Sequence, residues 1–65
     1  MQISINGKPH EVEAGTLAAL LDELDYGEAV VATALNQAFV RAADRHATKL
    51  HDGDQVEILV PRQGG

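Results

Sequence analysis

The sequence predicts an α+β domain in which a mixed sheet of roughly four to five strands carries one main helix on one face. Three observations lead to this fold class. Residues 1–5 and 55–60, near the two ends of the chain, alternate between apolar and polar side chains, which is the period of a half-buried strand. A segment between them carries four leucines at helical spacing. With 65 residues, the chain is long enough for one small core.

The first two strands are predicted to form a hairpin. An Asn-Gly turn at residues 6–7, where both residues tolerate positive φ, separates residues 1–5 from a second alternating segment at residues 10–13. Pro9 has no N–H to donate, so we expect the second strand at an edge of the sheet. Pairing across the turn should place Val12 on the apolar face of the first strand.

The helix is predicted to follow this hairpin. Gly15 interrupts the strand pattern, and Thr16 carries the side-chain oxygen of a good N-cap residue. We expect the helix to run for about ten residues, with Gly27 as the C′ residue beyond its end. Its buried stripe is expected to consist of Leu17, Leu20, Leu21 and Leu24.

The second half of the chain predicts further strands. Residues 29–35 are apolar on both faces, which is typical of a strand inside a sheet. A turn at residues 36–37 and a short returning strand at residues 38–40 should follow. Residues 41–46 are too polar for a packed helix and predict a turn or a single helical turn, and residues 48–50 are a candidate for a further short strand.

The last strand is expected over residues 55–60, after a tight turn at residues 52–54, and Pro61 should end it. The first and last strands are predicted to be parallel neighbours at the centre of the sheet. This order of elements is the β-grasp arrangement of ubiquitin-like domains, here over residues 1–60. The inward-facing residues of the last strand are expected to be Val56, Ile58 and Val60.

Composition excludes several classes of function. The formal net charge is −5 with most of the acidic excess in the first half, and an acidic chain is a poor ligand for phosphate backbones, so no nucleic-acid partner is expected. The absence of cysteine excludes a disulfide scaffold and a thiolate nucleophile. His10, His46 and His51 lack metal-ligand spacing, so no metal site is predicted. A chain this small cannot enclose a deep pocket, so we expect no catalytic residues and no enzyme.

The sequence also bears on location. The chain has no charged-then-apolar leader, and its apolar runs are far shorter than the roughly 20 residues that a membrane span needs. We therefore expect a cytoplasmic protein without membrane contact.

The C-terminal end is the candidate functional site. Residues 61–65 are expected to form a flexible tail of about 17 Å when fully extended. Gly64 would form a narrow neck, because it has no side chain, and the α-carboxylate of Gly65 is the group presented to a partner. Leu59 and Phe39 are candidates for a partner-docking surface if they are exposed near this tail; the alternative is that neighbouring side chains cover them.

Several short motifs occur along the chain in an order that is typical of one family. They are the hairpin at residues 3–7, the helix entry at residues 15–16, the turn at residues 34–37, the segment at residues 51–58 and the terminal glycines at residues 64–65. Together, and over its whole length, the chain resembles the ThiS family of sulfur carrier proteins in thiamine biosynthesis.

The resemblance implies a carrier protein rather than an enzyme. In that family the C-terminal glycine carboxylate, which would be Gly65 here, is adenylated by an ATP-dependent activating enzyme of the ThiF/MoeB kind and converted to a thiocarboxylate. A ThiG-like thiazole synthase then takes the sulfur to build the thiazole ring. The sulfur must come from a separate donor, because this chain has no thiol. The chain itself would bind no cofactor, since the activating enzyme uses the ATP.

Three other functions remain open at the level of sequence. A molybdopterin-synthase small subunit has a similar fold and glycine end, but such proteins are usually longer, with an extra segment in mid-chain. A ubiquitin-like protein modifier would join Gly65 to lysines of other proteins. A β-grasp RNA-binding or regulatory module would make the tail incidental, although a net charge of −5 and one Tyr plus one Phe argue against nucleic acid.

Overall fold

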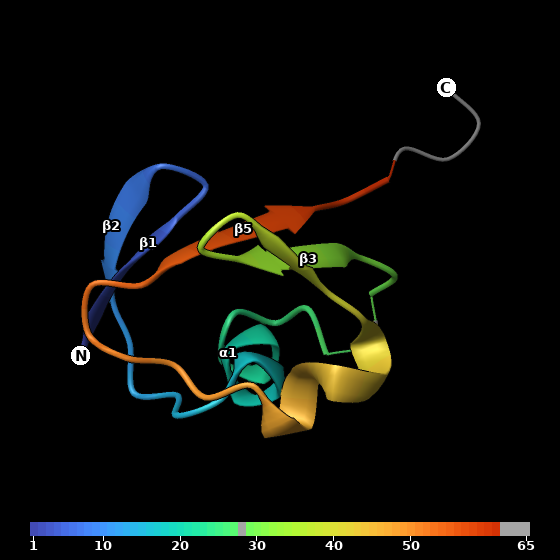
Figure 1. The fold of residues 1–65 in the computed structure, drawn as a ribbon, viewed down its shortest axis with the longest axis horizontal. Coiled ribbons are helices and arrows are strands. Elements are labelled where there is room, and N and C mark those ends of the chain that lie inside the picture. The colour runs from blue at the N-terminus through green and yellow to red at the C-terminus, as the bar shows by residue number, and fades with distance from the viewer. Residues whose placement is uncertain (28, 62–65) are drawn as a thin grey trace.

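A computed structural model of the chain describes residues 1–27 and 29–61. Five strands form one sheet in the order β2-β1-β5-β3-β4, and α1 lies against one face of it (Figure 1). The central neighbours β1 and β5 run parallel, and the other pairs are antiparallel, so the predicted α+β, β-grasp arrangement is confirmed. The elements are β1 (Gln2–Ile5), β2 (Lys8–Glu11), α1 (Leu17–Glu23), β3 (Ala32–Leu35), β4 (Ala38–Val40), the 3-10 helix η1 (Ala42–Ala47) and β5 (Gln55–Leu59).

The hairpin of β1 and β2 turns at the predicted residues. Asn6 and Gly7 both have positive φ, at 52° and 84°, as a tight two-residue turn requires. β2 is an edge strand, as Pro9 indicated, and all four of its residues are exposed. It ends at Glu11, earlier than the predicted alternation, yet Val12 is buried on the predicted face because its N–H donates to the Met1 carbonyl.

Helix α1 begins as predicted and ends earlier. The Thr16 side chain accepts a hydrogen bond of 3.1 Å from the Ala19 amide, which confirms the N-cap. The helix has seven residues rather than about ten, and the prediction of Gly27 as the C′ residue is wrong. Asp25 takes that position with φ 67°, because a short polar side chain tolerates the left-handed conformation. The amides of Asp25 and Tyr26 then bond back to the carbonyls of Asp22 and Leu21, the pattern of a Schellman motif.

Two other boundaries differ from the predicted ones. β3 begins at Ala32 rather than at residue 29, and Val30 before it is 81% exposed. Residues 48–50 form no strand, since they contribute one isolated bridge between Lys49 and Thr16.

Val60, predicted to face inward with Val56 and Ile58, is not part of the core, because its side chain is 50% exposed. The reason lies in the sheet. Ala32, the first residue of β3, pairs with Leu59, so the chain beyond Leu59 has no β3 residue opposite it. Val56 and Ile58 are buried as predicted.

The core lies between the helix and the inner face of the sheet. The leucine stripe supplies its centre: Leu17 and Leu20 are fully buried, Leu21 is buried, and Leu24 is half-buried at the margin. The remaining core residues are Ile3, Ile5, Val12, Ala14, Val31, Leu50, Val56 and Ile58.

Among the described residues, Thr33 is the buried polar side chain, and its hydroxyl forms hydrogen bonds to Arg45 and to the neighbouring strand. The Thr33 hydroxyl donates to the Val40 carbonyl at 2.8 Å and accepts from Nε of Arg45 at 3.1 Å. Nη2 of Arg45 also donates to the Val31 carbonyl at 2.7 Å. One side chain thereby attaches η1 to the start of β3.

Replacing Arg45 with methionine is expected to lower the free energy of unfolding by about 1–3 kcal/mol, because two part-buried groups lose a hydrogen-bond partner while the apolar stem is kept. Urea denaturation followed by circular dichroism measures this. Arg41→Met is the matched control: its ion pair with Asp44 is exposed, so its loss should cost at most about 0.5 kcal/mol. Equal effects of the two variants would contradict the attachment role of Arg45.

Candidate functional site

The two glycines of the predicted site, Gly64 and Gly65, lie outside the described residues. The structure places the segment that leads toward them. β5 is the central strand of the sheet and ends at Leu59 (Figure 1). Val60 and Pro61 follow it and are exposed. The surface around the end of β5 is therefore the part of the candidate site that can be described.

Phe39 and Leu59 are both exposed, at 71% and 69% of their surface, so the alternative that neighbours cover them is wrong. They lie on the outer face of the sheet, opposite the helix, because the alternating residues of each strand face the core. The register brings them to the same surface: Phe39 pairs with Ala34, and Leu59 pairs with Ala32.

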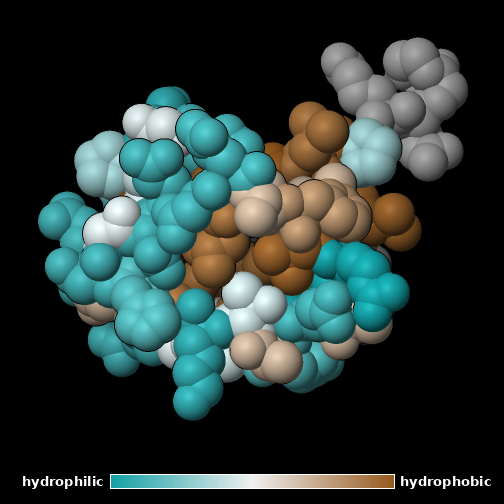
Figure 2. All heavy atoms as spheres, viewed as in Figure 1, coloured by the Kyte–Doolittle hydropathy of each residue, from teal (hydrophilic) through white to brown (hydrophobic). Residues whose placement is uncertain are grey.

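Two alanines make this surface hollow. Ala32 and Ala34 on β3 are the small residues between Phe39 on β4 and Leu59 on β5, and together these four line a shallow depression of about 210 Å³, joined by Thr33 and Glu57. We call Ala32, Ala34, Phe39 and Leu59 the outer apolar patch. Hydrophobic side chains gather where β5 ends, whereas the side of the molecule near the N-terminus is hydrophilic (Figure 2). A contiguous exposed apolar surface of this kind is typical of a site for another protein.

Sequence reasoning found the two large residues of the patch and missed the two alanines. A signal for them was present. Ala32 and Ala34 alternate with the buried Thr33, so the period of 2 in this strand already placed them on one face.

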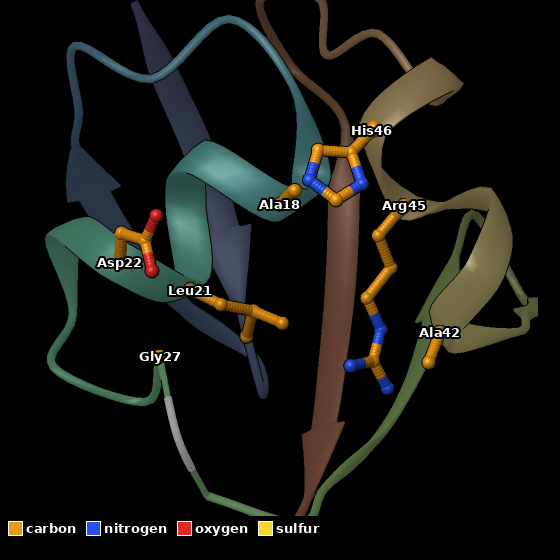
Figure 3. A pocket seen from close by; sticks show the side chains of 7 residues that line it. All are labelled: Ala18, Leu21, Asp22, Gly27, Ala42, Arg45 and His46. Atoms are coloured by element: carbon orange, nitrogen blue, oxygen red, sulfur yellow. The ribbon is translucent and has the colours of Figure 1, made fainter.

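A second concavity, of about 160 Å³, lies between α1 and η1 (Figure 3). The helix supplies Ala18, Leu21 and Asp22, and η1 supplies Arg45 and His46. Arg45 is already engaged with the carbonyl and hydroxyl of β3, so its position is explained by the attachment of η1.

The histidines do not gather at a common site. His10 lies on β2, His46 on η1 and His51 before β5, and all three are exposed. Within residues 1–27 and 29–61, no group of three or more His, Asp or Glu side chains is placed to hold a metal ion. In the same ranges, no helix is long and apolar enough to cross a bilayer.

The fold and this surface define a class of protein. A small sheet grasping one helix, with an apolar outer surface beside the end of the central last strand, is a ubiquitin-like β-grasp protein. The family model described as the ThiS family matches residues 3–65. The chain belongs to the ThiS family.

Individual relatives agree with this assignment. The chain is 34% identical over 61 residues to the sulfur carrier protein ThiS of Thermus thermophilus, covering 94% of this chain and 95% of that protein. It is 40% identical over 60 residues to a thiazole synthase of Magnetococcus marinus, covering 91% of this chain but spanning 18% of that longer protein.

Solved structures show the same architecture. The crystal structure of the thiamine biosynthesis protein ThiS from Geobacter metallireducens superposes with a TM-score of 0.82 at 35% identity, over 100% of both chains. The solution structure of a thiamine biosynthesis protein from the same organism gives a TM-score of 0.82 at 32% identity, over 100% of this chain and 88% of that one.

Proposed function

We propose that this protein is a sulfur carrier of thiamine biosynthesis and that the carboxyl group of Gly65 carries the sulfur. The observation that supports this most directly is the family match, which extends to residue 65 and includes both terminal glycines. The β-grasp body offers no deep pocket among its described residues, which fits a protein acted upon by others.

The chemistry starts from an unreactive group. An α-carboxyl group has a pKa of about 3.3–3.7, so at neutral pH it is an anion and a poor electrophile. In the proposed activation, a carboxylate oxygen of Gly65 attacks the α-phosphorus of ATP and pyrophosphate leaves. A hydrosulfide ion released by a sulfur donor then attacks the acyl carbon, the C–O bond to AMP breaks, AMP leaves, and loss of a proton gives the thiocarboxylate.

An activating enzyme and a sulfur donor must supply this chemistry, because the chain has neither a thiol nor a nucleotide-binding motif. Gly64 would serve as the neck that lets Gly65 enter the partner's active site, since glycine is the narrowest residue. The carrier contributes position rather than catalysis.

A ThiG-like thiazole synthase is the proposed acceptor of the sulfur. The support is the thiazole synthase of Magnetococcus marinus, in which a region similar to this chain is part of one longer polypeptide. Covalent linkage keeps two domains at high effective concentration, which is useful when one must serve the other. Co-purification with a thiazole synthase would separate this function from that of a molybdopterin-synthase small subunit.

Intact-mass spectrometry tests the proposal. Replacing one terminal oxygen with sulfur raises the mass by about 16 Da, and this should occur when the chain is incubated with the activating enzyme, ATP and a sulfur source. Oxidation of Met1 adds the same nominal mass, so fragmentation must assign the change to the peptide that contains Gly65. A chain that never gains the C-terminal change beside an active partner enzyme contradicts the proposal.

The outer apolar patch is the proposed docking surface for the partner enzymes. Phe39→Ser should raise the KM of the activating enzyme for the carrier at least about tenfold, because a buried aromatic anchor is the usual centre of an interface. The exposed position of Phe39 means that folding should be nearly unchanged.

The control for this test is His10→Ser, which removes an exposed ring from β2 at the opposite edge of the sheet. Steady-state kinetics with the carrier as the varied substrate measures both variants. Equal KM values for Phe39→Ser and the unaltered protein would remove Phe39 from the docking surface.

A further inference from the structure

We propose that Asn6 is a positioning residue that fixes the point at which the C-terminal segment leaves the sheet. The inference rests on the proposed function, because its consequence is efficient presentation of Gly65 to the activating enzyme. It starts from three hydrogen bonds that one turn residue makes to the last strand.

Asn6 continues the pairing of β1 with β5 by means of its side chain. Its backbone N–H donates to the Val56 carbonyl at 2.9 Å. One position later the chain turns toward β2, so β1 offers no further peptide group to β5. The side-chain amide takes that place: Oδ1 accepts from the Ile58 N–H at 2.9 Å, and Nδ2 donates to the Ile58 carbonyl at 3.1 Å.

The left-handed conformation of Asn6 makes this contact compatible with the hairpin. Its φ of 52° belongs to the two-residue turn, and asparagine is one of few residues with a side chain that adopt it at low cost. β5 continues beyond the β1–β2 turn toward the C-terminal end (Figure 1). The amide therefore holds β5 at the last position where the β1 side of the sheet can reach it.

Asn36 makes the equivalent contact at the other end of the same strand. It is the first residue of the β3–β4 turn, with φ 50°. Its N–H donates to the Gln55 carbonyl at 2.7 Å, and its Oδ1 accepts from the Gln55 N–H at 2.9 Å. Asn36 and Asn6, each the first residue of a two-residue turn, thus hold β5 from opposite sides. Asn36 holds Gln55 at the start of the strand, and Asn6 holds Ile58 near its end.

The two contacts differ in what lies beyond them. Gln55 leads back to a tight turn, whereas Ile58 leads directly to Leu59 of the outer apolar patch and then to the C-terminal residues. Without the Asn6 amide, the end of β5 would be held from the β3 side alone, through the pairing of Leu59 with Ala32. The strand end from which the tail leaves would then be free to move relative to β1 while it stays paired with β3, so the direction of the exit would be less well fixed.

A loss of this kind acts on binding rather than on the chemical step. A partner enzyme that needs the patch and the tail in one arrangement binds in proportion to the fraction of molecules in that arrangement. Once bound, the strand end is in place, and the reaction proceeds as before. The signature of a positioning role is therefore a raised KM with an unchanged kcat.

The test compares Asn6→Gly with Asn36→Gly. Glycine keeps the positive φ of each turn and removes the side-chain amide, so the hairpins remain. Each variant loses two side-chain hydrogen bonds: those of Asn6 to Ile58, or those of Asn36 to Gln55 and Asp54. Hydrogen exchange should show the Ile58 amide exchanging at least about tenfold faster in Asn6→Gly alone, and the Gln55 amide accelerated in Asn36→Gly alone. Both variants are assayed at a temperature where circular dichroism shows them fully folded.

Activation of the full chain is then followed by ATP–pyrophosphate exchange. We expect Asn6→Gly to raise the KM for the carrier about tenfold with kcat within about twofold, and Asn36→Gly to leave both nearly unchanged.

The outcomes are distinct. An equal KM change in both glycine variants, or none in Asn6→Gly, overturns the positioning role while leaving the carrier function intact. Failure of the unaltered protein to be activated overturns the proposed function, and the exchange rates of the Ile58 and Gln55 amides still decide whether the two asparagines hold β5 as described.

Discussion

Deletion of Gly65 is expected to abolish thiocarboxylate formation and to leave the free energy of unfolding within about 0.5 kcal/mol of the unaltered value. The deletion moves the α-carboxylate to Gly64, one residue short of where the partner's active site would receive it. A displacement of this size separates the reacting atoms by several times the roughly 1 Å misplacement that already costs about a hundredfold in rate. The folded body is unaffected because the core closes within residues 3–58.

Gly64→Ala is the finer form of the same experiment. The chain length and the terminal carboxylate are kept, and one methyl group is added to the proposed neck. We expect slower activation with unchanged stability. Intact-mass time courses with the activating enzyme, ATP and a sulfur source measure both variants. A chain ending at Gly64 that still supported full thiazole formation would exclude the terminal carboxyl of Gly65 as the sulfur site.

Leu20→Ala is expected to have the opposite profile, with a loss of about 2–5 kcal/mol in the free energy of unfolding. Leu20 is fully buried between α1 and the sheet, so its truncation leaves a cavity that a small core cannot refill. Domains of this size have total stabilities at the low end of about 5–15 kcal/mol, so the variant could be largely unfolded at 37 °C. Guanidinium denaturation measures the change.

Leu24→Ala is the matched control for this prediction. It makes the same chemical change at the C-cap residue of the same helix, at a half-buried position, and should cost clearly less. Thermal melts of Leu20→Ala, Leu24→Ala and Gly64→Ala separate the folded body from the functional end. If Gly64→Ala lowered Tm as much as Leu20→Ala, this separation would be wrong.

The periodic features of the chain were predictable because they depend on neighbours in sequence. The leucine stripe, the alternation in the last strand, the Thr16 cap and the Asn-Gly turn each follow from spacing and residue type. The parallel pairing of the first and last strands followed from fitting these elements to one helix on one sheet.

Other features depend on partners that are distant in sequence, and these were missed. The C′ residue beyond the helix is Asp25 rather than Gly27, because the amides of Asp25 and Tyr26 bond back to carbonyls of the last helical turn, although aspartate has a lower intrinsic preference for this position than glycine. Val60 is half-exposed rather than part of the core, since β3 provides no partner beyond Leu59. The attachment of η1 by Arg45 could not be read from the local pattern.

The same distinction applies to the candidate site. Phe39 and Leu59 could be selected from the sequence as residues without an assigned place in the core. That the two side chains lie on one surface, with two alanines between them, could be predicted only with knowledge of the pairing register of the strands. The contact of Asn6 with Ile58 joins positions at opposite ends of the chain, and the Asn-Gly motif alone accounted for Asn6 as a turn residue.

The central place of β5 has a consequence for synthesis in the cell. Because β5 fills the gap between β1 and β3, and its Val56 and Ile58 complete the hydrophobic layer under α1, residues 1–54 have no finished core to fold around. A nascent chain must therefore stay unfolded until these last strand residues emerge from the ribosome. Products that terminate before β5 would remain open to proteases, so that the pool of folded molecules consists of those in which β5 was translated.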